Sequence, residues 1–116
     1  MEMITLYPTG KFPVQFNGNL LSQEEGFYER IEEFGNTFYT IWVATKISLY
    51  KIEKNKYIVF EEKTRTKGRT DPSSSIKTII NCRDYSDIET AVNRRDLPSN
   101  FPLDKLFKAT GIIRPI

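Results

Sequence analysis

Cationic residues occupy every second position of one short segment, residues 63–69, which reads Lys-Thr-Arg-Thr-Lys-Gly-Arg. In an extended chain, residues two apart point to the same side, so these cations would form a single row. Such a row can follow the phosphates of a nucleic acid or hold the charges of one nucleotide. We therefore predict an anion-binding surface that also includes two arginines at the end of a later helix: Lys63, Arg65, Lys67, Arg69, Arg94 and Arg95.

The distribution of charge along the chain agrees with this prediction. Residues 1–62 hold six Lys or Arg and nine Asp or Glu, a net charge of −3, whereas residues 63–116 hold eleven and six, a net charge of +5. A molecule with a negative and a positive side suits an anionic ligand or head-to-tail self-association. The alternative is that neighbouring opposite charges neutralise one another and that the basic segment is a solvated loop.

The residue types argue against most conventional catalysis. The chain has no histidine, which removes the commonest general base, the catalytic triads that depend on it and most zinc sites. The single cysteine, Cys82, ends an apolar run, where a buried and unreactive thiol is expected. The six glycines do not have the spacing of a phosphate-binding loop. We therefore expect no catalytic residue, no metal and no cofactor.

One pattern resembles a catalytic motif. Glu61 and Lys63 form an ExK triplet similar to that of restriction-like nucleases of the PD-(D/E)xK type. The resemblance implies metal-dependent cleavage of a phosphodiester bond, with a further acid that shares the metal. Glu53 is the candidate for that acid, but the expected hairpin places it near the tip rather than opposite Glu61. The other interpretation is an edge strand kept soluble by its charges.

Hydrophobic periodicity predicts the elements that position these residues. We expect residues 23–34 to form an amphipathic helix, because Ser22 would cap it and Phe27, Ile31 and Phe34 would share one face. The other expected elements are strands at residues 3–7, 11–16, 37–52, 57–64 and 76–82 and helices at residues 87–95 and 102–110.

These elements favour a single α+β domain over residues 1–116, with an antiparallel sheet of about four to five strands and two to three helices packed on one face. The strand at residues 37–52 should be central, because residues 37–43 are almost continuously apolar, and Trp42 should be buried in it. From residue 23 to residue 95, the order helix, three strands, helix resembles that of double-stranded RNA-binding domains. Beyond this order the residues identify no family.

Two functions agree with these expectations. The first is a non-catalytic module that binds an anionic ligand, either nucleic acid or a nucleotide. The alternative is a small protein-interaction factor, such as a viral or mobile-element inhibitor of a host protein, that uses an aromatic or charged face. The start of the chain lacks the pattern of a signal peptide, and no apolar run approaches the ~20 residues of a membrane span. With one cysteine as well, we expect a cytoplasmic protein that does not enter the membrane and that can form homo-oligomers.

Overall fold

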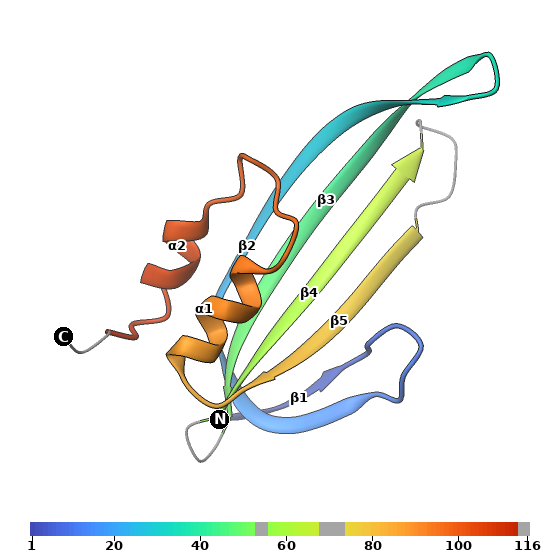
Figure 1. Ribbon diagram of the computed structural model, residues 1–116. Coiled ribbons are helices and arrows are strands. Elements are labelled where there is room, and N and C mark those ends of the chain that lie inside the picture. The colour runs from blue at the N-terminus through green and yellow to red at the C-terminus, as the bar shows by residue number, and fades with distance from the viewer. Residues whose placement is uncertain (53–55, 68–73, 114–116) are drawn as a thin grey trace.

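The computed structural model describes residues 1–52, 56–67 and 74–113, which form five antiparallel strands followed by two short helices (Figure 1). Each strand pairs with its neighbour in sequence, so the sheet is a meander in the order β1-β2-β3-β4-β5. Antiparallel neighbours of this kind need only short connections. The elements are β1 (Glu2–Leu6), β2 (Val14–Phe34), β3 (Thr37–Ile52), β4 (Lys56–Lys67), β5 (Ser74–Cys82), α1 (Tyr85–Asn93) and α2 (Leu103–Lys108).

The prediction of a helix at residues 23–34 is wrong, because this segment lies within β2. The order of elements that resembled double-stranded RNA-binding domains is therefore wrong as well. β2 pairs with β3 along a ladder that runs from Gly18 to Phe34. Phe27 and Ile31 have helical spacing, but the long partner strand gives this segment backbone hydrogen bonds and cross-strand packing that a helix cannot use.

β2 and β3 extend beyond the other strands as a two-stranded arm, which projects past the end of β4 in Figure 1. Among the described residues, β4 pairs with β3 from Ile41 to Ile52, and β1 pairs with β2 from Val14 to Gly18. Here the arm means residues 27–44, of which residues 31–40 lie beyond the described part of β4. Its turn contains a glycine, residue 35, at φ 64°, a left-handed conformation that glycine adopts without steric cost.

One face of the sheet, called here the inner face, carries the buried odd-numbered residues of β3. At the base of the sheet, Ile47 and Leu49 on this face join Val59 of β4 and side chains from both helices in one buried cluster. α1 contacts β4 and β5, whereas α2 contacts β2. The helix residues of the cluster are Ile88, Ala91 and Val92 of α1 and Leu106 of α2.

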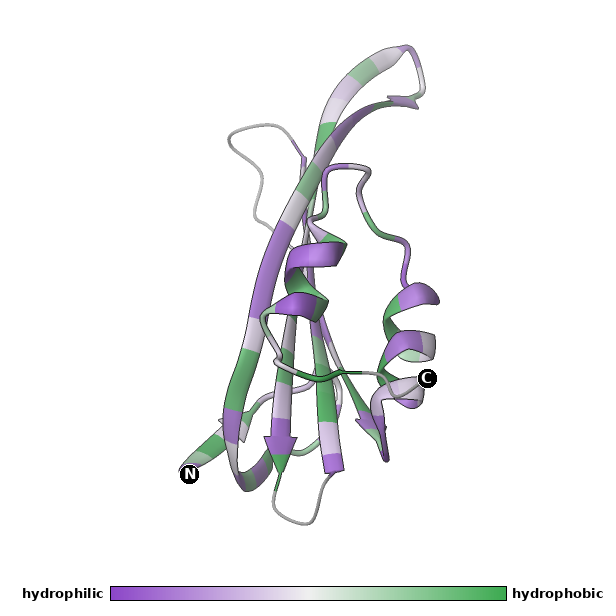
Figure 2. Ribbon diagram, turned by 90° about the vertical axis from the view of Figure 1, so that its left-hand side faces the viewer, coloured by the Kyte–Doolittle hydropathy of each residue, from purple (hydrophilic) through white to green (hydrophobic). Residues whose placement is uncertain are grey.

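The opposite face, called here the far face, has a second core near the base. β1 and the first part of β2 curl over this face, so that Leu6 joins Ile58 and Phe60 in a buried cluster. Thr9, in the turn after β1, donates its N–H to the carbonyl oxygen of Lys77 (2.9 Å) and accepts the N–H of Lys77 at its hydroxyl (2.8 Å). The curl therefore brings the first turn against β5. Figure 2 shows how apolar and polar residues alternate along the strands that build the two cores.

The central position of β3 is confirmed, because it pairs with β2 on one side and with β4 on the other. The expected burial of Trp42 is wrong. Val43 is only 4% exposed on the inner face, whereas Trp42 points to the far face and is 42% exposed. The curl of β1 covers the far face near the base alone, so the continuous apolar run of β3 is not buried on both faces.

Both helices after the sheet are confirmed, with shifted ends. α1 begins at Tyr85, after Asp84, whose side chain accepts the N–H of Asp87 at 2.9 Å. The fold is mostly sheet, so α+β describes it loosely: a curled antiparallel sheet of five strands with two short helices. No helix in the described part of the chain has the length and apolar character to cross a membrane.

Candidate functional site

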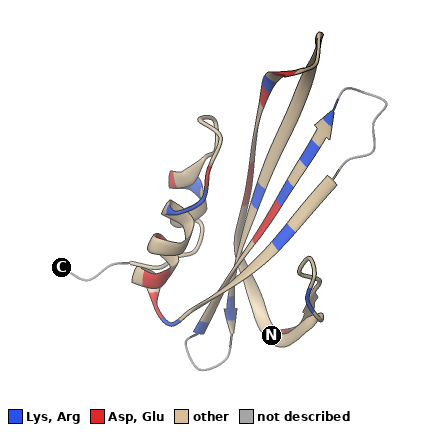
Figure 3. Cartoon of the chain, turned by 45° about the vertical axis from the view of Figure 1, so that its right-hand side comes forward, with Lys and Arg blue, Asp and Glu red and all other residues tan. Residues whose placement is uncertain are grey.

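The predicted row of cations lies on β4 and points to one face. Lys63, Arg65 and Lys67 stand opposite inner-face residues of β3, so their side chains share the inner face, as their alternate spacing predicted. Figure 3 shows basic residues as blue bands along β4. Arg69, the fourth member of the predicted row, lies outside the described residues. The name cationic row is kept here for Lys63, Arg65 and Lys67.

Each residue of the cationic row has a partner within the protein. Arg65 forms an ion pair with Glu32 of β2, and Glu32 in turn pairs with Arg30 (2.6 Å). The Lys67 ammonium group lies 3.9 Å from the ring centroid of Tyr39, and it also lies over Phe34 at the end of the arm. These contacts join β4 to the arm.

Lys63 contacts the loop after α1, where its ammonium group donates to the carbonyl oxygen of Asp96 (3.3 Å). With Arg65 it borders a cavity of about 300 Å³ on the inner face, which reaches the arm at Arg30. This volume is at the lower end of those that hold small organic ligands. The cavity is lined by Tyr28, Arg30, Val43, Lys63, Arg65, Ser74, Ile76 and Asp96.

The two predicted arginines after α1 do not line this cavity. Arg95 lies 3.8 Å from Glu61, whose side chain is nearly buried. Arg94 borders a different hollow, of about 370 Å³, beside Cys82 and Arg83. The structure therefore brings Lys63, Arg65 and Lys67 onto one face of β4, whereas Arg94 and Arg95 do not line the cavity that Lys63 and Arg65 border.

The ExK pattern forms no metal centre in the described residues. Glu61 faces Arg95 rather than a second carboxylate, and Glu53, the candidate third acid, is outside the described residues. In the described ranges no group of three or more His, Cys, Asp or Glu side chains is arranged to hold a metal ion.

The far face of the arm carries a row of exposed apolar side chains that the sequence analysis did not identify. The exposed fraction of the side chain is 54% for Phe27, 72% for Ile31, 68% for Phe38 and 42% for Trp42. Phe27 and Trp42 lie against each other, with ring centroids 6.3 Å apart. The register of β2 with β3 places all four on the same face. We call these four residues the apolar stripe.

Acidic residues alternate with the apolar stripe along β2. Glu29 lies between Phe27 and Ile31, Glu33 follows Ile31, and both glutamates share the far face. Reading this segment as a strand would have revealed the alternation, because residues 27, 29, 31 and 33 then fall on one face. In a helix the same four residues would not share one face, so the helical interpretation did not predict this alternation.

The outer edge of β2 is open along the arm. The N–H of Phe27 points away from β3 and donates to the side-chain oxygen of Asn100 at 3.1 Å. Because backbone groups alternate in direction along an antiparallel ladder, those of Glu29, Ile31 and Glu33 also point away from β3. No strand in the described part of the chain pairs with this edge beyond Gly18.

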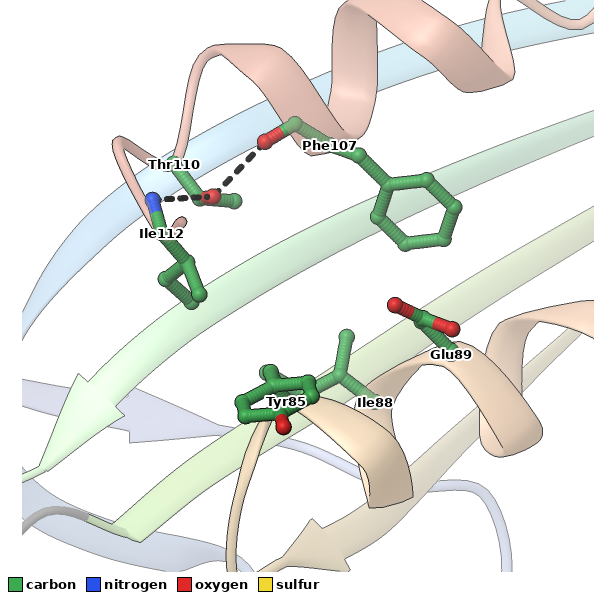
Figure 4. Close-up of a pocket in the computed structure, with 6 residues that line it drawn as sticks. All are labelled: Tyr85, Ile88, Glu89, Phe107, Thr110 and Ile112. Atoms are coloured by element: carbon green, nitrogen blue, oxygen red, sulfur yellow. Dashed lines mark hydrogen bonds between the residues drawn. The ribbon is translucent and has the colours of Figure 1, made fainter. Parts of the chain in front are cut away.

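A smaller pocket lies between the two helices (Figure 4). Its volume is about 120 Å³, less than a nucleotide needs. The Thr110 hydroxyl, which belongs to the lining, donates to the carbonyl oxygen of Phe107 (2.7 Å) and accepts the N–H of Ile112 (3.1 Å). The pocket is lined by Tyr85, Ile88, Glu89, Phe107, Thr110 and Ile112.

Cys82 is buried, as predicted, in the core between the sheet and the helices. Burial and, to a smaller extent, the nearby carboxylates of Asp87 and Asp84 raise the pKa of its thiol to about 11. The thiol is therefore protonated at neutral pH, which suits a structural role.

The chain was compared with protein-family models, with curated proteins and with solved structures, and none of the three comparisons found a match.

Proposed function

We propose that this protein is a non-catalytic interaction factor that binds another protein through the far face of its arm. The apolar stripe carries the proposal. Isolated exposed apolar residues are common on protein surfaces, but a contiguous row of large ones marks an interaction site. Aromatic residues such as Trp42 and Phe27 are the side chains that most often anchor a protein interface.

The rest of the arm supports this proposal, because the contacts of the cationic row hold the arm in place. A two-stranded hairpin alone is at best marginally stable in water. Arg65 and Lys67 attach this one to β4 through Glu32, Tyr39 and Phe34. A binding surface that is ordered before the partner arrives loses less conformational entropy on association.

The test is selection of peptides from a displayed random library on the purified protein. Peptides that bind the wild type should lose at least tenfold in affinity for the double variant Ile31→Ser, Phe38→Ser. The matched control is Phe12→Ser, which removes another exposed apolar side chain far from the arm. Equal binding to the wild type and to the arm variant, or an equal loss in the control, would contradict the proposal.

A second candidate function is the binding of an anionic ligand, nucleic acid or a nucleotide, on the inner face. The observation that favours it is the cavity of about 300 Å³ bordered by Arg30, Lys63 and Arg65. An anion there would compete with Glu32 for both arginines. Binding at low salt that weakens as salt rises would support this candidate.

A further inference from the structure

The open edge of β2 indicates how a partner would bind, on the premise that the arm is the binding surface as proposed above. We infer that the partner contributes an extended segment that pairs with β2 along the arm as an additional strand and that presents Lys or Arg in alternation with apolar residues along one of its two faces. The backbone, the side chains and the charge of the arm each support one part of this inference.

Within the described part of the chain, the backbone of β2 offers hydrogen-bonding groups that no other strand pairs with and that point in the correct direction. Glu29, Ile31 and Glu33 present N–H and C=O groups away from β3, and β1 ends its pairing at Gly18, far down the strand. Asn100 occupies the N–H of Phe27 and so marks where the open part of the edge begins. An extended peptide can add to such an edge through main-chain hydrogen bonds, while its alternate side chains supply specificity.

The side chains of β2 define the chemistry of the added strand. On the far face, a strand beside β2 would place its residues next to Phe27 and Ile31 and next to Glu29 and Glu33. Apolar residues would extend the apolar stripe, and cations would face the two glutamates. In the described part of the arm, the far face holds these two carboxylates and neither lysine nor arginine. A basic and apolar segment is thus complementary to it.

A second copy of the chain is not complementary to this edge. If two β2 strands paired antiparallel about Ile31, Glu29 of each copy would stand opposite Glu33 of the other. Like charges directly opposite each other destabilise a strand pair. The same glutamates that attract a basic strand therefore disfavour self-association at this edge.

The library selection described above tests the inference through the sequences that it returns. We expect peptides whose every second residue is by turns Lys or Arg and an apolar residue, so that a cation recurs at every fourth position with an apolar residue midway between two cations. Their affinity should fall at least tenfold for the double variant Glu29→Lys, Glu33→Lys. The matched control is Glu2→Lys, Asp104→Lys, which makes the same change in charge at exposed positions away from the arm.

Backbone methylation of a selected peptide tests strand addition itself. N-methyl groups on the alternate peptide residues whose backbone N–H groups point toward β2 should abolish binding. The same groups on the other peptide residues should leave binding unchanged. Two results would overturn the inference but not the proposed function. In the first, the selected peptides need Ile31 and Phe38 of the protein but carry no recurring Lys or Arg. In the second, the peptides still bind with an N-methyl group at any position. Binders that ignore the arm overturn both the inference and the proposed function. A dimer in sedimentation analysis that Ile31→Ser dissociates would assign the edge to a second copy and also overturn the inference.

Discussion

Arg65 of β4 forms an ion pair with Glu32 of β2 across the intervening strand β3. The pair joins two strands that share no backbone hydrogen bonds. Both side chains are partly exposed, so the pair contributes little to overall stability. Its effect is local, because it fixes the position of the arm relative to the body of the sheet.

Replacement of Glu32 by Gln should loosen the arm without unfolding the protein. The change removes the charge that pairs with Arg65 and Arg30. We expect the free energy of unfolding to change by less than about 1 kcal/mol, because the pair is partly exposed and screened by solvent. Backbone amides of residues 30–41 should exchange with deuterium faster than in the wild type. Glu33→Gln, a matched change on the far face, should leave this exchange unchanged; faster exchange in both variants would contradict the role of the ion pair.

The anion-binding candidate makes a prediction about salt. If the cavity binds phosphates, each contact should contribute about 0.7–0.9 to the slope of log affinity against log salt. The double variant Lys63→Ala, Arg65→Ala should reduce that slope by the contribution of roughly two contacts. Glu32→Gln should raise the affinity for the anion, because it frees Arg65 from its ion pair. Fluorescence anisotropy with a short labelled oligonucleotide and calorimetry with nucleotides measure both effects. The control is the double variant Lys105→Ala, Lys108→Ala on α2. An equal decrease of the slope in this control would show that the overall charge of the protein, and not the cavity, sets the salt dependence.

Trp42 and Ile47 should respond differently to truncation. Ile47 is fully buried on the inner face, so Ile47→Ala should cost about 2–5 kcal/mol in the free energy of unfolding. Trp42 is half exposed on the far face, and Trp42→Ala should cost clearly less despite the larger side chain. Urea unfolding of the two variants measures this. An equal or larger loss for Trp42→Ala would contradict its position on the open face.

Cys82 should make stability depend on alkaline pH. Burial raises the pKa of this thiol from its usual value near 9 to about 11 in the folded protein. Between these values the unfolded chain releases the proton and the folded chain keeps it, so the stability that is present below pH 9 should be lost as the pH rises toward 11. Urea unfolding at a series of pH values should show a steeper loss in the wild type than in Cys82→Ala. The same slope in both proteins would count against a buried, protonated thiol.

Sequence patterns were sufficient where local signals agreed. The alternation of β4 and the apolar run of β3 predicted two strands, and the hydrophobic periodicity after Cys82 predicted both helices. Between residues 23 and 34 the local signals conflicted. Phe27, Ile31 and Phe34 fit a helix, whereas Gly26 and the neighbouring aromatic residues Phe27 and Tyr28 disfavour a helix or favour a strand. Pairing with β3, which is not a local property, decided between them.

The same conflict limited what could be predicted about the site. The direction of Lys63, Arg65 and Lys67 followed from their spacing, because any strand imposes it. Their partners did not follow. Glu32 could not be placed beside Arg65 while its segment was interpreted as a helix, and the apolar stripe became visible only once β2 and β3 were paired.

Gly26 is an example of a residue whose role only packing reveals. In a helix it would weaken the element, but in β2 it lies against the loop before α2. A Cβ atom at this position would come within 2.9 Å of the Cα of Phe101, so a larger residue would push the loop away. The same loop carries Asn100, which bonds to Phe27. The close approach of this loop to Gly26 thus determines the residue of β2 at which the covered part of its edge ends and the open part begins.

The hydrogen bonds between Thr9 and Lys77 have a consequence for polymerisation. A sheet with two free edges can polymerise, because each strand that adds leaves a new edge for the next molecule. Here the turn after β1 occupies the edge of β5 at Lys77, so another strand cannot pair there. The open edge of β2 along the arm therefore cannot pair with β5 at Lys77, which removes one route by which copies of the chain could join head to tail into a fibre.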